Sequence, residues 1–98
     1  MANEPEPRIA DNPQDHRYEA HVGDTLAGYA EYQLAGDTIT FTHTIVDPEY
    51  EGQGVGSSLA GFALDDARRR GLKGVAECQF IAVYARRHPE YAELFSKS

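Results

Sequence analysis

The order of apolar and polar residues predicts three β-strands in the first half of the chain. Residues 16–22, 25–34 and 38–46 alternate β-branched, aromatic or aliphatic residues with polar ones, and Gly, Asp and Pro separate the runs. A period of two with turn residues between the runs is typical of an antiparallel meander. In the third run this alternation places on one face Ile39, Phe41, His43 and Ile45.

The period becomes helical after residue 54. Apolar residues then recur at spacings of three and four, at Val55, Leu59, Phe62, Ala63 and Ala67. Three arginines followed by Gly71 place cations in the last turn and a glycine beyond the end, so a helix is predicted over 55–70. Residues 74–80 predict a fourth strand, and residues 81–95 predict two short helices separated at His88-Pro89.

The order β-β-β-α-β-α predicts an α+β fold with a mixed, mainly antiparallel sheet. The predicted helix is the crossover that joins the third strand to the fourth. The 98 residues suffice for one domain, which we assign to residues 14–98. Residues 1–13 are rich in Pro, Glu, Asn and Asp and predict a disordered or loosely attached tail.

Composition excludes several classes of function. The net charge is −7, with two bases against eleven acids in residues 1–52, which argues against binding nucleic acid. No apolar run approaches the roughly 20 residues that span a membrane, and the N-terminus does not resemble a signal peptide. The single cysteine, Cys78, and the absence of Cys/His ligand spacing predict a cytoplasmic protein without a metal site.

The most informative segment is the glycine loop, residues 51–56. Gly52, Gly54 and Gly56 precede the predicted helix, so a ligand can approach the backbone closely. The free N–H groups and the positive end of the helix dipole favour a phosphate or pyrophosphate there. No Gly-Lys-Ser/Thr follows, and the spacing fits dinucleotide sites poorly, so nucleoside triphosphates and nicotinamide cofactors are disfavoured.

The strand, the glycine loop and the amphipathic helix resemble the acetyl-CoA pyrophosphate site of the GNAT acyltransferases. Further matching segments resemble the very small, single-domain branch of GNAT-like acetyltransferases: residues 43–46, 63–68, 71–73, 84–91 and Cys78. The resemblance covers residues 15–95. It implies a GNAT-like fold, acetyl-CoA or coenzyme A as cofactor, and an amine as acceptor.

The resemblance also implies which residues contact the cofactor. The backbone near Val46 would bind the pantetheine arm, and the loop amides with a serine would bind the pyrophosphate. Arg86 or Arg87 would pair with CoA phosphates. The predicted set is Ile45, Val46, Gly52, Gln53, Gly54, Val55, Gly56, Ser57, Arg86 and Arg87. Glu51 stands where GNAT loops carry Gln or Arg, and an acid there disfavours a pyrophosphate unless it points away.

Three residues are candidates for catalysis. The resemblance places Cys78 on the strand beside the acetyl group, where its thiolate could accept the acetyl group; a lone cysteine is otherwise a small buried hydrophobe. His43 is the predicted activating base, because an ordinary histidine pKa of about 6.5 suits proton transfer, and its alternative role is in the core. Tyr84 is the predicted proton donor to the departing thiolate, or else a packed tyrosine.

The predicted function is transfer of an acetyl group to an amine of a small molecule or of a protein lysine or N-terminus. Direct attack by the amine and a route through Cys78 both fit the sequence. Two other classes of function also fit: a non-catalytic CoA-binding sensor or interaction module, and an interaction domain without a ligand.

Overall fold

The computed structural model describes residues 7–95, which form a five-stranded sheet and two α-helices. The strands are β1 (Arg8–Asn12), β2 (Arg17–Val22), β3 (Thr25–Ala35), β4 (Thr38–Val46) and β5 (Lys73–Ala76). The helices are α1 (Val55–Arg69) and α2 (Gln79–Arg87). Short 3-10 helices follow β1, β4 and α2: η1 (Pro13–Asp15), η2 (Pro48–Tyr50) and η3 (Pro89–Phe95).

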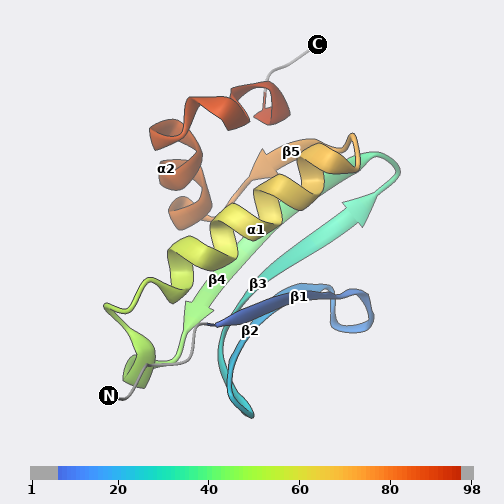
Figure 1. Cartoon of the computed structure of the whole chain (residues 1–98). Helices are drawn as coiled ribbons and strands as arrows, with labels where there is room; N and C mark the ends of the chain where they lie inside the picture. The colour runs from blue at the N-terminus through green and yellow to red at the C-terminus, as the bar shows by residue number, and fades with distance from the viewer. Residues whose placement is uncertain (1–6, 96–98) are drawn as a thin grey trace.

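The sheet has the order β1-β2-β3-β4-β5 (Figure 1). The first four strands are antiparallel neighbours, and β5 pairs in parallel with β4 after the α1 crossover. The predicted mixed, mainly antiparallel sheet and the crossover helix are therefore confirmed. None of the helices among residues 7–95 is long and apolar enough to span a membrane.

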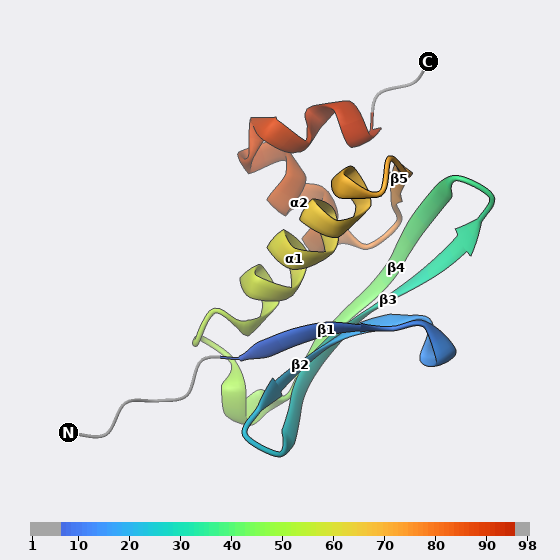
Figure 2. The same ribbon diagram turned by 45° about the vertical axis from the view of Figure 1, so that its right-hand side comes forward.

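Both helices lie on the same face of the sheet, which gives the molecule two layers (Figure 2). Tyr84 of α2 packs against Gly61 of α1, which brings the helices close together. The core between the layers includes the large, fully buried side chains of Tyr18, Ile39, Phe41, Leu59, Leu64 and Ile81. The opposite face of the sheet carries charged pairs such as Arg17 with Glu19.

The first strand was not expected from the sequence. The predicted loose tail over residues 1–13 includes Arg8–Asn12, which forms the edge strand β1 and pairs with β2. The first six residues of that tail lie outside the described residues. Ile9 packs against the core and Asp11 accepts a hydrogen bond of 2.6 Å from the hydroxyl of Tyr32 on β3. These two contacts explain why a short, polar segment joins the sheet.

Replacing Tyr32 with phenylalanine should lower the free energy of unfolding by about 1 kcal/mol, because the variant loses the hydroxyl that binds Asp11. Urea denaturation at neutral pH measures this difference. The matched control is Tyr29→Phe, since the Tyr29 hydroxyl makes no hydrogen bond within residues 7–95. Equal effects of the two substitutions would contradict the role given to the Tyr32–Asp11 bond.

A β-bulge in β4 changes which residues face the helices. Glu31 pairs with His43 whereas the next residue, Tyr32, pairs with Phe41, so Thr42 is an extra residue on β4. One extra residue reverses the inward and outward alternation beyond it. The prediction that Ile39, Phe41, His43 and Ile45 share a face is therefore wrong beyond Phe41. Thr44 and Val46 face the helices, and His43 and Ile45 face the opposite side.

The fourth predicted strand is also shorter than expected. β5 ends at Ala76, and α2 begins at Gln79, so the second half of the predicted strand 74–80 belongs to the turn and the helix. The N–H groups of Glu77 and Cys78 both donate to the carbonyl of Phe41, each at 2.9 Å. These bonds end the β4–β5 pairing at the bulge and turn the chain into α2, with Cys78 as its N-cap.

Candidate functional site

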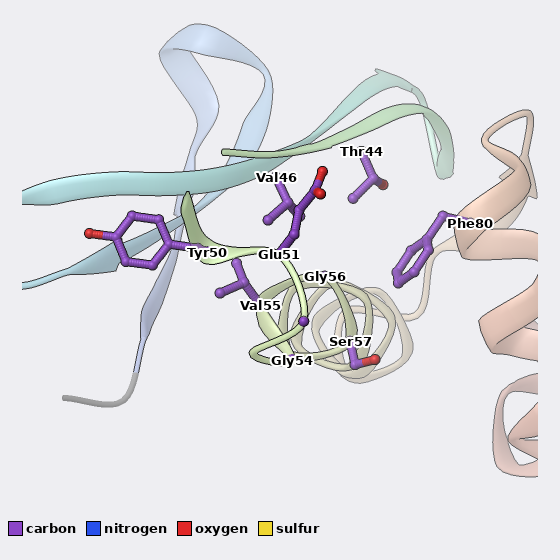
Figure 3. A pocket seen from close by; sticks show the side chains of 10 residues that line it. Thr44, Val46, Tyr50, Glu51, Gly54, Val55, Gly56, Ser57 and Phe80 are labelled. Atoms are coloured by element: carbon purple, nitrogen blue, oxygen red, sulfur yellow. The ribbon is translucent and has the colours of Figure 1, made fainter. Parts of the chain in front are cut away.

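A cavity of about 390 Å³ lies between the second half of β4, the start of α1 and the start of α2 (Figure 3). We call it the β4–α1 cavity. Ten residues line it: Thr44, Val46, Tyr50, Glu51, Gly52, Gly54, Val55, Gly56, Ser57 and Phe80. Six of the ten belong to the set predicted to contact a cofactor, so the structure brings the glycine loop and the end of β4 to one site.

The wall formed by β4 is an unpaired strand edge. β5 pairs with β4 only as far as Phe41, so the segment beyond the bulge has no strand neighbour on that side among the described residues. The N–H of Asp47 donates to the carbonyl of Ala27 on β3 at 2.8 Å. Because backbone groups alternate in direction along a strand, the N–H and C=O of Val46 point away from β3, toward the cavity. An extended ligand with amide groups can hydrogen-bond there as a strand would.

The glycine loop places backbone amides at the opposite end of the cavity. Gly52 and Gly54 have φ angles of 82° and 84°, a conformation that favours glycine. Gly54 is the N-cap of α1, and the first bond of the helix runs from Ser58 N–H to its carbonyl at 2.9 Å. The amides from Val55 to Ser57 therefore have no acceptor within the helix. With the positive end of the dipole they form an anion site.

The one ionised side chain in the lining of the cavity is negative, whereas an anion site ordinarily carries a positive one. Glu51 is exposed and its carboxylate extends toward β4, between Val46 and Thr44 (Figure 3). The other nine lining residues carry no ionised side chain near neutral pH, and none of the ten is a lysine or arginine. Glu51 therefore does not point away from the site, which is the arrangement in which the sequence predicts that it disfavours a pyrophosphate.

Cys78 lies beside the cavity rather than in its lining. It is 8% exposed, and its Sγ is 3.2 Å from Oγ1 of Thr44, which does line the cavity. The prediction that Cys78 lies on a strand is wrong, since it caps α2. Its thiol packs in the apolar core, and its one hydrogen-bond contact among the described residues is with the Thr44 hydroxyl, which is not a base.

The structure does not bring His43 to Cys78. Beyond the bulge His43 and Thr44 point to opposite faces of the sheet, and Thr44 is the one that contacts the cysteine. His43 Nδ1 lies 3.3 Å from Oε1 of Glu31 on the open face, and its side chain is 68% exposed. The predicted pair of an activating histidine and a nucleophilic cysteine is therefore corrected, because the extra residue at the bulge separates them.

Tyr84 points toward the α1 helix. Its hydroxyl lies close to Gly61, its ring stacks on His88 with centroids 3.9 Å apart, and burial, with Asp65 and Glu90 nearby, raises its pKa. The ring nearer to the cavity belongs to Phe80, four residues earlier on α2, which packs against Gly56.

The remaining predicted residues lie around the cavity or away from it. Arg86 lines a separate apolar groove between β5, α2 and η3, and Arg87 is exposed in the last turn of α2. The side chain of Ile45 is exposed on the open face, and the side chain of Gln53 turns back to the carbonyl of Glu49 at 3.3 Å. Within residues 7–95 no group of three or more His, Cys, Asp or Glu is arranged to bind a metal.

Four lining residues were not in the predicted set: Thr44, Tyr50, Glu51 and Phe80. The sequence offers a signal for Phe80, because it precedes Tyr84 by four residues and so shares its helix face. Tyr50 follows Pro48-Glu49 in the 3-10 turn that leads from β4 into the glycine loop. Thr44 could be identified only with knowledge of the bulge.

Comparison with known proteins gives matches both to sequences and to solved structures. Residues 17–94 match the sequence model of a family described as GCN5-related N-acetyl-transferase. The N-alpha-acetyltransferase RimI of Mycobacterium tuberculosis is 44% identical over 61 residues, which are 58% of this chain and 39% of that protein. The match therefore spans well under two thirds of this relative.

Solved structures show a similar fold. The NMR structure of a GCN5-like protein from Staphylococcus aureus has a TM-score of 0.70 at 22% identity, over 93% of this chain and 89% of that one. The crystal structure of the ribosomal-protein-S18-alanine N-acetyltransferase from Escherichia coli has a TM-score of 0.56 at 28% identity, over 58% of this chain and 37% of that one. The similarity to the Staphylococcus aureus protein shows a shared fold, and this fold extends over nearly the whole chain.

Proposed function

The chain belongs to the GCN5-related N-acetyltransferase family, and on that premise we propose that it binds acetyl-CoA in the β4–α1 cavity and acetylates an amine. The observation that carries the proposal is the combination of two backbone features in one cavity. The unpaired edge of β4 ends beside the free amides of the glycine loop and α1. Few ligands other than a chain of amides joined to a pyrophosphate would use both.

The residues present fit this cofactor. The backbone of Val46 would bind the amides of the pantetheine arm. The backbone N–H groups of Gly54 to Ser57 would bind the pyrophosphate. A Cβ added at Gly52 or Gly54 would meet no atom within 4 Å, so the space beside the loop is open. When bound, acetyl-CoA supplies a thioester whose acyl group is activated toward an amine. Orienting the two reactants can lower the barrier by about 7–11 kcal/mol.

The surroundings of Cys78 favour direct attack by the amine over a route through the cysteine. A covalent route needs a thiolate, and the thiol is almost buried next to a neutral hydroxyl. In the direct route the side chains of Thr44 and Phe80, which line the cavity, would shape its wall beside the bound cofactor.

Replacing Cys78 with alanine should therefore leave the rate of acetyl transfer within about threefold of the original, with a small loss of stability from the vacated volume. The measurement is CoA release with a thiol reagent, together with intact-mass analysis after mixing with acetyl-CoA. Loss of turnover in Cys78→Ala and Cys78→Ser, with an acetyl adduct seen only in the unsubstituted protein, would establish the covalent route instead.

The acceptor that we propose is the α-amino group of a protein or peptide. The support is the relative of 44% identity, which is an N-alpha-acetyltransferase, and the similar crystal structure named for an alanine N-terminus. The test is CoA release with a peptide that begins with alanine, its N-terminally blocked form, free lysine and an aminoglycoside. Turnover only with the free N-terminus supports the proposal, and turnover only with another amine would overturn this choice.

A second candidate function is binding of CoA without catalysis. The observation that favours it is the cavity lining, which contains no histidine or cysteine and only two titratable side chains, Tyr50 and Glu51. Calorimetry with CoA and the release assay separate the two functions, because a sensor would show heat of binding and no turnover with any acceptor.

A further inference from the structure

Glu51 is the one side chain of the β4–α1 cavity that carries a full charge near neutral pH, and that charge is negative. Its carboxylate extends toward Thr44 and Val46, on the side of the cavity opposite the helix amides (Figure 3). No hydrogen bond or ion pair of the Glu51 side chain occurs within residues 7–95, so no cation neutralises it there. The same turn also carries Asp47 and Glu49, and Glu49 is exposed outside the lining.

Two opposing electrostatic effects therefore act on an anion in this cavity. The amides of Gly54 to Ser57 and the dipole of α1 attract it, but this attraction is made of partial charges. The carboxylate of Glu51 repels it with a full charge from within the same cavity, and because this side chain is exposed the repulsion is open to screening by salt. Neither lysine nor arginine lines the cavity to offset the repulsion.

We propose that Glu51 sets the affinity of this chain for CoA by weakening the binding of the pyrophosphate. The inference rests on the proposed function, since it assumes that CoA is the ligand. Glu51 acts as a binding determinant with an unfavourable contribution: it lowers affinity and makes binding depend on the screening of its charge by salt. A protein with such a loop releases its ligand easily and fills its site only when CoA is abundant or cations are present.

The test is the Kd for CoA measured by calorimetry in the unsubstituted protein and in Glu51→Gln. Glutamine keeps the shape of the side chain and removes its charge, so we expect binding to tighten about tenfold or more at low ionic strength. The difference between the two proteins should shrink when NaCl is raised from about 20 mM to about 300 mM, because the Debye length falls well below 10 Å.

Glu49→Gln is the matched control, because it changes the net charge equally on the same turn but lies outside the lining. Its Kd should stay within about threefold of the original, since an exposed charge farther from the ligand is screened by water. A second control uses pantetheine, which lacks the phosphates, so Glu51→Gln should change its affinity much less than it changes the affinity for CoA.

Equal Kd values for Glu51→Gln and the unsubstituted protein, or an equal gain in Glu49→Gln, would overturn the role of Glu51. Absence of CoA binding in all three proteins would instead overturn the proposed function. Thermal denaturation of each variant checks that it is folded. Because both glutamate side chains are exposed, neither substitution should change the melting temperature. A loss of structure would therefore be recognised and not mistaken for either outcome.

Discussion

Replacing Asp66 with alanine is expected to lower the free energy of unfolding by about 3 kcal/mol. Asp66 is only 8% exposed and accepts hydrogen bonds from Tyr18 Oη at 2.7 Å, from Arg70 at 3.1 Å and from Arg69. The variant removes the hydrogen bond that ties α1 to β2 and leaves the buried hydroxyl of Tyr18 without its partner. It also removes the charged hydrogen bonds from Arg69 and Arg70 at the end of α1. Urea denaturation at pH 7 measures the loss.

The contribution of Asp66 should also depend on pH with a defined sign. Burial alone would raise the pKa of Asp66, but the hydrogen bonds from Tyr18, Arg70 and Arg69 outweigh it and lower the pKa. A lowered pKa means that the stabilisation is complete above the ordinary carboxyl value of about 4 and is lost as the pH falls through the lower value in the folded protein. The difference between the unsubstituted protein and Asp66→Asn should therefore shrink below pH 4.

Asp24→Asn is the control for this experiment, because Asp24 is exposed in the turn between β2 and β3. It should change stability by less than about 0.5 kcal/mol at any pH. A difference between Asp66→Asn and the unsubstituted protein that stayed constant from pH 7 to acid would show that shape, and not charge, accounts for the contribution of Asp66.

The parts of the fold that the sequence predicted well are those that local chemistry decides. Gly23 and Gly36 begin the two hairpin turns with positive φ angles, and the three arginines and Gly71 mark the end of α1 as expected. The free amides at the start of α1 were predictable for the same reason, because glycines followed by a helix start are local features of the sequence.

The parts that were not predicted depend on pairing between distant segments. Nothing in the alternation of residues 38–46 reveals the extra residue at Thr42, because a bulge is fixed by the register with β3. That single residue moved His43 out of the predicted site and moved Thr44 into it. Similarly, the segment around Cys78 suits a strand locally, but the N–H groups of Glu77 and Cys78 donate to the carbonyl of Phe41 and the strand ends before them.

Replacing Gly54 with alanine should weaken CoA binding about tenfold or more, which is the second large effect that we expect. Gly54 has a φ of 84°, and alanine in this conformation costs about 1–2 kcal/mol. The variant relieves this strain by leaving the left-handed conformation, which turns the amides at the start of α1 away from the pyrophosphate. Ligand binding must then restore the strained geometry, and about 1.4 kcal/mol corresponds to a tenfold change in Kd.

Gly36→Ala separates this effect from strain alone. Gly36 also has a positive φ, 60°, and a Cβ there would meet no atom within 4 Å, but the residue lies in the turn between β3 and β4, outside the cavity lining. Both variants should lose comparable stability in urea, while only Gly54→Ala should lose affinity for CoA in calorimetry. Equal affinities would mean that the ligand is not bound by the amides of the helix start. The anion site would then have to lie elsewhere, because the other lining residues offer no cation to replace those amides.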